Sequence, residues 1–170
     1  MPRLRNLAIR VRGGEPLPEG VQLDLVRSER VLTWGRVAGG GIAAATDFGL
    51  RIRPGDGGEP ATHLWHEINR ATWTDGDLTV EDMSGAAASY RLSEPRGVPV
   101  AVREHVNATV VISDHHSLGD VGVRVVARRD LRTGQLVWST VFDRPADADN
   151  ASLNAAADQL LTAVRRRFGA

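Results

Sequence analysis

The sequence contains no cysteine and no lysine. Without cysteine, the chain cannot form disulfide bonds, thiolate zinc sites, iron–sulfur clusters or a thiol nucleophile. All 21 basic residues are therefore arginine, and they balance 21 acidic residues. No run of about 18 apolar residues is present, so the sequence predicts no membrane-spanning helix. We expect a cytoplasmic protein without a bound cofactor.

The balanced charge is spread unevenly along the chain. Residues 54–95 carry two arginines and eight acidic residues, whereas the segments on either side are richer in arginine. Binding to DNA depends on neutralising phosphates, so a neutral chain with an acidic middle predicts no nucleic-acid partner. Residues 1–12 contain arginines but lack a long apolar core, so we expect no signal peptide. Residues 1–20 are interpreted as an N-terminal arm or linker.

Length predicts a single domain over residues 21–170. A chain of 170 residues with 42% hydrophobic residues is large enough to bury a core. Within this domain, residues 30–92 predict barrel strands, and residues 97–170 predict an extension of further strands plus a C-terminal helix.

The clearest local signal is a hairpin around Asp75-Gly76. This dipeptide favours a two-residue turn in which both residues have positive φ, and such a turn fixes the register of the flanking strands. Trp73 then lies opposite Leu78, and Ala71 lies opposite Val80. Side chains alternate between the faces of a strand, so these four share one apolar face. Turn chemistry and apolar pattern agree on one register, which predicts a hairpin over 71–80.

Together with this hairpin, further runs of this kind give residues 30–92 about seven short strands with tight turns. Such a series predicts an up-and-down antiparallel sheet that closes or curls into a small barrel. The triple glycine at 39–41 lies between two of the strands. No lysine and no helix follow it, so it is interpreted as a hairpin loop and not as a phosphate-binding loop.

Four segments carry a resemblance to a known family. Residues 29–34 (ERVLTW), 44–50 (AATDFGL), 64–73 (LWHEINRATW) and 78–80 (LTV) follow one another as in bacterial pleckstrin-homology-like (PH-like, GRAM-like) domains. The match covers residues 28–82, and the whole chain resembles actinobacterial proteins of similar length. The chain departs from the family pattern at two places. Residues 47–49 replace the basic pair that usually follows the threonine, and residues 63–64 stand where the family often has a proline before the tryptophan. The resemblance implies a PH-like fold and carries over no catalytic residue.

The second part of the chain changes character after Pro95. Residues 98–106 predict a short helix, residues 109–113 a strand, and residues 114–120 a loop. Residues 121–129 and 135–142 predict two more strands. Apolar residues at helical spacing then predict a C-terminal helix, with Asp149, Asn150 or Ser152 as its cap. The strands and this helix either extend the barrel or form a second βββα layer.

Together these features predict an α+β fold, mainly an antiparallel PH-like β-barrel or curled sheet with a C-terminal amphipathic helix. The predicted core comprises Trp34, Trp65, Trp73, Leu78, Trp138, Phe142, Leu153, Leu160, Leu161 and Val164.

Histidines are the first candidate site residues. His63 and His66 are three apart, but on an extended segment their side chains diverge, so both are interpreted as structural. His105, His115 and His116 are weak candidates for metal ligands, because imidazole suits zinc or nickel. Adjacent residues ligate one ion poorly, so no metal site is predicted.

Arginines are the second candidate group. Guanidinium groups suit phosphate and carboxylate ligands. Arg124 and Arg128 fall on one strand face, and a solvated sheet surface explains the same pattern. The candidate residues for an anionic ligand are Arg124, Arg128, Arg129 and Arg132.

We therefore expect a non-enzymatic binding or scaffolding module that contacts a protein partner, through loops or through an exposed strand edge. One alternative is a PH-like module for an anionic ligand or lipid headgroup, with contact to a membrane surface. Another is a small metal-dependent enzyme that uses the region of His105, His115 and His116. A homodimer is a further option for the partner.

Overall fold

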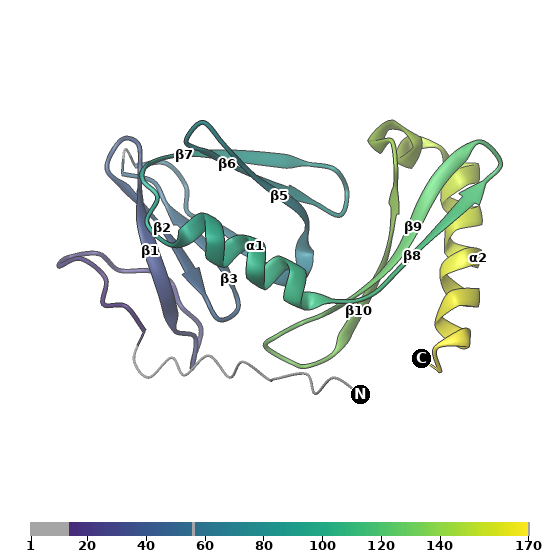
Figure 1. Ribbon diagram of the computed structural model, residues 1–170, viewed down its shortest axis with the longest axis horizontal. Helices are drawn as coiled ribbons and strands as arrows, with labels where there is room; N and C mark the ends of the chain where they lie inside the picture. Colours follow the sequence, from purple (N-terminus) through teal and green to yellow (C-terminus); the bar gives the residue numbers. More distant parts are fainter. Residues whose placement is uncertain (1–13, 56, 170) are drawn as a thin grey trace, which may run out of the picture.

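The computed structural model describes residues 14–55 and 57–169 (Figure 1). Two halves follow one another along the chain, a first half (residues 14–109) and a second half (residues 110–169). The first half contains β1 (Val31–Val37), β2 (Gly41–Thr46), β3 (Gly49–Arg53), β4 (Ala61–Leu64), the short 3-10 helix η1 (Trp65–Glu67), β5 (Ile68–Thr74), β6 (Asp77–Asp82), β7 (Ala87–Glu94) and α1 (Val98–Thr109). The second half contains β8 (Val110–Leu118), β9 (Val121–Arg129), β10 (Leu136–Phe142), the 3-10 helix η2 (Pro145–Asp149) and α2 (Ala151–Arg167).

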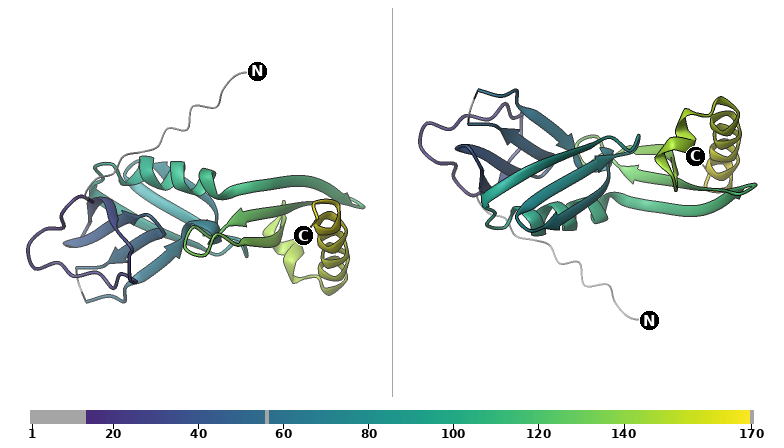
Figure 2. Two further views of the ribbon diagram at one scale, coloured as in Figure 1. Left: turned by 90° about the horizontal axis from the view of Figure 1, so that it is seen from below. Right: turned by 90° about the horizontal axis from the view of Figure 1, so that it is seen from above.

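The strands form two antiparallel sheets. The first half holds a seven-stranded sheet in the order β4-β3-β2-β1-β7-β6-β5, and the second half a three-stranded sheet in the order β10-β9-β8. The predicted α+β class, the antiparallel strands and the C-terminal helix are confirmed. In the described residues β4 and β5 do not pair, so the first sheet is strongly curled but not a closed barrel. Two turned views show the halves side by side along the long axis (Figure 2).

The hairpin over 71–80 has the predicted register. Trp73 pairs with Leu78 and Ala71 pairs with Val80. The turn residues Asp75 and Gly76 have φ values of 52° and 91°. Both values are positive, as the predicted two-residue turn requires. Turn chemistry and the two-residue period of the strands therefore suffice to define this element.

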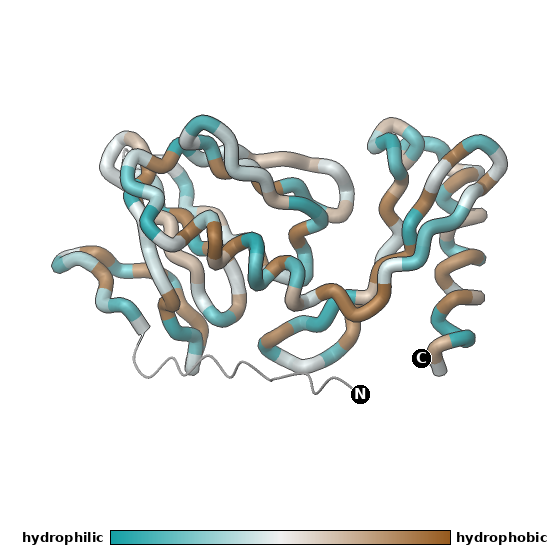
Figure 3. Tube along the Cα trace, viewed as in Figure 1, coloured by the Kyte–Doolittle hydropathy of each residue, from teal (hydrophilic) through white to brown (hydrophobic). Residues whose placement is uncertain are grey.

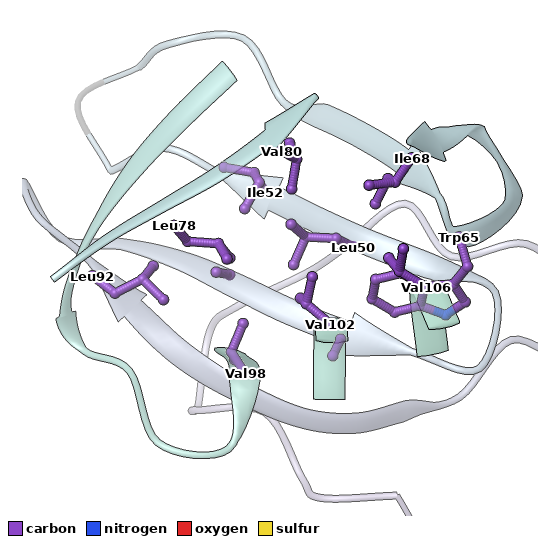
Figure 4. Close-up of a cluster of buried hydrophobic side chains, with 12 residues drawn as sticks. Leu50, Ile52, Trp65, Ile68, Leu78, Val80, Leu92, Val98, Val102 and Val106 are labelled. Carbon is purple, nitrogen blue, oxygen red and sulfur yellow. The ribbon is translucent and has the colours of Figure 1, made fainter. Parts of the chain in front are cut away.

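The core of the first half lies between the curled sheet and α1 (Figure 4). Val98, Val102 and Val106 follow at intervals of four, which places them on one face of α1, and all three are buried. They pack with Trp65, whose ring is fully buried and whose Nε1 donates to the carbonyl oxygen of Thr46 over 3.0 Å. The helix that covers the first sheet is thus α1, which directly follows the last strand.

The other face of the first sheet is covered by a segment without helix or strand. Leu17, Val21 and Leu23 of this segment pack against Ile42 and Ala44 of β2. Every residue of β2 is buried as a result. Its run of alanines fits this position, because small side chains let covering segments approach a strand from both faces.

The second half forms a βββα layer of its own beside the first sheet. α2 lies along one face of the three-stranded sheet, and Ala157 of α2 packs with Val123 and Phe142. Asn150 caps α2, because its side chain accepts from the backbone N–H groups of Ser152 and Leu153. The sequence left open whether these strands extend the first sheet or form a second layer, and in the structure they form a separate three-stranded sheet. Apolar stretches occupy the strands of both halves and the passage from α1 into β8 (Figure 3).

Two predictions in these elements are wrong. Residues 114–118 were expected in a loop, but they continue β8, and only Gly119 and Asp120 form the turn to β9. Pairing with β9 compensates for the low strand propensity of Asp114, which lies opposite Val125. Trp73 was expected in the core, but 40% of its surface is exposed. It lies beside the turn of an edge hairpin, where the sheet has no further strand to cover it.

The remaining predicted core residues divide into two groups. Trp65, Leu78, Phe142 and Val164 are buried. Trp34, Trp138, Leu153, Leu160 and Leu161 are partly buried. No helix in the described residues has the length and apolar character needed to cross a bilayer.

Candidate functional site

The three histidines proposed as metal ligands do not converge. His105 lies on α1, where its Nδ1 is 2.9 Å from the carbonyl oxygen of Ala101 and its ring packs against Trp65. His115 and His116 are neighbours on β8, so they point to opposite faces of the sheet. His115 Nε2 lies 2.9 Å from a carboxylate oxygen of Asp143. Within residues 14–55 and 57–169, no group of three or more His, Cys, Asp or Glu side chains could hold a metal ion.

The four candidate arginines also separate. Arg124 and Arg128 share a face of β9, as predicted, whereas Arg129 falls on the other face. Arg129 donates to the carbonyl oxygen of Gly134, and Arg132 lies 3.8 Å from a carboxylate oxygen of Asp130. An anion would therefore not meet all four guanidinium groups on one surface.

Arg128 is itself buried and bonded within the protein. Its Nη1 donates to the carbonyl oxygen of Val106 and to the hydroxyl of Thr109, and its Nη2 donates to the carbonyl oxygen of Asn69. Burial, together with the nearby positive charge of Arg124, lowers the pKa of Arg128. Its donors connect β9 of the second half with α1 and β5 of the first half, so its observed contacts are structural.

A different surface combines an unpaired strand edge with exposed apolar side chains. β5 is the last strand of the seven-stranded sheet, so one of its edges has no neighbouring strand among the residues that the structure describes. Beside that edge, a groove of about 160 Å³ runs between β5 and α1. We call this groove the β5–α1 groove. It is lined by Ala71, Thr72, Trp73, Leu78, Pro99, Val100 and Arg103.

Hairpin geometry tells which backbone groups of β5 point outward. In a hairpin with a two-residue turn, the residues that flank the turn exchange hydrogen bonds, and every second residue repeats this pattern. Thr74 and Thr72 therefore bond to β6, while the N–H and C=O groups of Trp73 and Ala71 point away from the sheet. Further along the strand, the carbonyl oxygen of Asn69 accepts from Arg128. The free edge of β5 thus centres on Ala71 and Trp73.

The side chains beside this edge are more exposed than ordinary core residues. Trp73 is 40% exposed and Val100, on α1, is 52% exposed. Pro99 also lines the groove, at the first turn of α1 where a missing N–H has no cost. Arg103 is the one charged residue among those that line the groove. The surface therefore offers apolar contacts, backbone hydrogen bonds and one positive charge.

Sequence reasoning found part of this surface but assigned it differently. The register of Trp73 was correct, and its exposure was not anticipated. The outward position of Val100 could have been found, because it is offset by two residues from the buried positions Val98 and Val102 on α1.

His63 and His66 lie outside the β5–α1 groove. His63 is on β4, and its Nε2 lies 2.7 Å from the hydroxyl of Tyr90. Burial lowers the pKa of His63 and raises the pKa of Tyr90. His66 is in η1, 9% exposed, and its Nδ1 lies 3.8 Å from a carboxylate oxygen of Asp130. The two histidines therefore have separate partners.

Comparison with protein-family models, with curated proteins and with solved structures finds no match for this chain.

Proposed function

We propose that the protein is a non-enzymatic binding module that accepts an extended segment of a partner protein along the free edge of β5. The observation that carries the proposal is the position of the exposed Trp73 beside an unpaired strand edge. An added strand would complete the outward hydrogen bonds of Ala71 and Trp73. The resemblance of residues 28–82 to PH-like domains is compatible with this role, and a PH-like fold remains part of the proposal.

Edge strands are a hazard for a soluble protein, which is why they are usually shortened, covered or marked by charge. β5 has seven residues, and on its edge Trp73 and Ala71 alternate with small polar threonines. Arg70, its one charged residue, lies 3.8 Å from a carboxylate oxygen of Glu81 on β6. An edge with so little protection supports a role in recognition.

The lining of the β5–α1 groove suggests the chemistry of the bound segment. Side chains of an added strand alternate, so every second one would face the groove. Trp73, Val100 and Pro99 favour an apolar or aromatic side chain there. Arg103 favours an acidic residue next to it. We therefore expect an extended motif with apolar residues two apart and an acidic neighbour.

A selection of random twelve-residue peptides against the full-length protein tests the proposal. Selected peptides should lose binding to Trp73→Ala by about tenfold or more, as expected when an aromatic residue anchors an interface. Phe168→Ala is the matched control, because Phe168 is 50% exposed and lies at the end of α2, away from the groove. It should bind the same peptides as the wild type.

Ala71→Pro separates strand addition from simple apolar contact. Proline removes the outward N–H of residue 71 and leaves the bonds between β5 and β6 intact. Peptides that add a strand should lose most of their affinity for this variant. Peptides that bind Ala71→Pro and Trp73→Ala as tightly as the wild type would show that the β5 edge is not the binding site.

A further inference from the structure

A second and larger hollow lies between the two halves. This cleft has a volume of about 580 Å³, within the range of small-molecule sites. One wall is formed by β4, η1 and the strands β6 and β7, and the facing wall by Val137 and Ser139 of β10. In Figure 1, β10 crosses beside the first half at this position. We call this hollow the interhalf cleft.

Contacts on two sides hold the walls of the interhalf cleft in place. In the turn between β6 and β7, a Cβ added to Gly85 would lie 3.0 Å from the Cβ of Pro145 in η2. The turn and η2 are therefore in close contact. Elsewhere, Arg128 of β9 bonds to the carbonyl oxygens of Val106 and Asn69 in the first half. The cleft is thus formed before any ligand enters.

The charged residues that line the cleft are all acidic or histidine. Glu67, Glu81 and Asp82 line it, and no arginine does, although arginine supplies every basic residue of the chain. A hydrogen bond from Ser84 contributes most to lowering the pKa of Asp82, which favours the ionised form of this carboxyl. The lining therefore repels anions and attracts cations.

The three carboxylates differ in how far the protein already uses them. Glu81 accepts from the side chain of Asn69, and one oxygen of Asp82 accepts from Ser84. Glu67, by contrast, is exposed and makes no hydrogen bond or ion pair with any other residue that the structure describes. Glu67 is therefore the carboxylate most available to a ligand.

His66 adds a polar ring to the lining of the cleft. Its side chain is 9% exposed, and its Nδ1 lies 3.8 Å from a carboxylate oxygen of Asp130. This ring therefore already has an acidic partner inside the protein, and Glu67 remains the group that a ligand would meet.

Apolar side chains cover the rest of the walls. Ile68 and Val80 line the first half, and both are buried in the sheet. Val137 lines the second half and is 42% exposed. Acceptors and apolar surface thus lie together in one cleft.

We propose that the interhalf cleft binds a small organic cation that carries an N–H-rich head on a short apolar stem, such as an alkylguanidinium. The head would donate to Glu67, and the stem would pack against Val137. A planar guanidinium matches a carboxylate through two parallel hydrogen bonds. This site is separate from the β5–α1 groove and does not depend on it.

Titration of the full-length protein with n-butylguanidinium, followed by ¹H–¹⁵N NMR, tests the inference. Saturable shifts are expected at the backbone amides of Glu67, Ile68, Val137 and Ser139. Two probes of the same length, n-butanol and butyrate, should produce no saturable shift, because the first lacks the charge and the second has the wrong sign.

Glu67→Gln should weaken n-butylguanidinium binding by about tenfold, the effect of losing one charge-assisted contact. Because Glu67 is exposed and makes no hydrogen bond with another described residue, this change should leave the fold intact. Glu104→Gln removes an equal charge from the exposed surface of α1 and should bind like the wild type. Val137→Arg places a guanidinium of the protein itself in the cleft and should abolish binding.

Three outcomes would overturn the inference: no saturable binding of n-butylguanidinium, equal binding of butyrate, or binding that Glu67→Gln and Val137→Arg both leave unchanged. Trp73→Ala should have no effect on this titration. A failure of the interhalf cleft can therefore be told apart from a failure of the β5–α1 groove.

Discussion

Arg128 provides the most direct test of how the two halves are joined. It is 6% exposed, and three hydrogen bonds attach its guanidinium to the carbonyl oxygens of Val106 and Asn69 and to the hydroxyl of Thr109. Among the described residues no carboxylate lies within ion-pair distance of it, and its Nε has no hydrogen-bond partner. Its charge is instead offset by the carbonyl oxygens at the C-terminal end of α1, where a helix carries partial negative charge.

Arg128→Met removes the donors and keeps an unbranched apolar side chain. The carbonyl oxygen of Asn69 then loses a donor, at a cost of about 1–3 kcal/mol for a buried acceptor. Losing the hydrogen bond to the carbonyl oxygen of Val106 costs less, about 1 kcal/mol, because this oxygen still accepts from the hydroxyl of Thr109 over 2.7 Å. Removing the buried guanidinium also removes its desolvation penalty, which offsets part of this loss of stability. We expect the free energy of unfolding to fall by about 2 kcal/mol, since the lost hydrogen bonds outweigh the relieved desolvation.

Urea unfolding monitored by ¹⁹F NMR of 5-fluorotryptophan measures this change in each half. Trp65 lies in the core of the first half, and Trp138 lies on β10 in the second half. In the wild type both resonances should change at one urea concentration. In Arg128→Met the midpoint should fall, and the two resonances should separate if Arg128 is what couples the halves.

Arg129→Met is the matched control, because Arg129 is exposed and donates only to the carbonyl oxygen of Gly134 among the contacts described. Its effect should stay within about 0.5 kcal/mol. An Arg128→Met protein that is as stable as the wild type, or more stable, would refute the reasoning. Desolvation of the guanidinium would then exceed the value of its hydrogen bonds.

Three further predictions concern other parts of the chain. Asn150→Ala removes the cap of α2 and should lower the free energy of unfolding by about 1 kcal/mol in urea titrations, whereas a neutral result would contradict the capping role. Gly122→Ala would place a Cβ against Oδ2 of Asp143, so it should displace that carboxylate and lower the melting temperature; an unchanged temperature would show that the side chain moves aside freely. Burial raises the pKa of Glu29, but hydrogen bonds from Arg51 and Thr46 lower it more, and the net pKa is below its usual value. The stabilisation from ionised Glu29 is therefore complete above the usual pKa of 4.5 and is lost as pH falls through the lower folded pKa. Glu29→Gln should cost about 3 kcal/mol at pH 7, and the difference from the wild type should shrink on acidification; a difference independent of pH would contradict this assignment.

Local patterns in the sequence predicted the elements whose causes are local. The Asp75-Gly76 turn fixed the register from Ala71 to Val80, because a two-residue turn allows one alignment of its strands. The apolar spacing of the C-terminal segment and a cap at Asp149, Asn150 or Ser152 predicted α2, and Asn150 is the cap in the structure.

Local patterns failed where a distant partner changes the outcome. Asp114 and its neighbours look like a loop on their own, yet they form strand because β9 supplies hydrogen bonds to them. Arg128 looks like one member of a basic surface, yet its burial and its bonds to Val106 depend on how β9 meets α1. Sequence alone could not show either, since it does not specify which segments meet.

The candidate sites follow the same division. The sequence by itself determined the strands, the turns, the apolar face of each helix and the supply of arginine and histidine side chains. Only the tertiary structure decided that β5 ends the sheet, that Trp73 is exposed on that edge, and that β10 faces η1 across the interhalf cleft. The reason is physical: periodicity and turn chemistry act between neighbours in the chain, whereas an edge, a groove or a cleft exists only once distant segments have packed together.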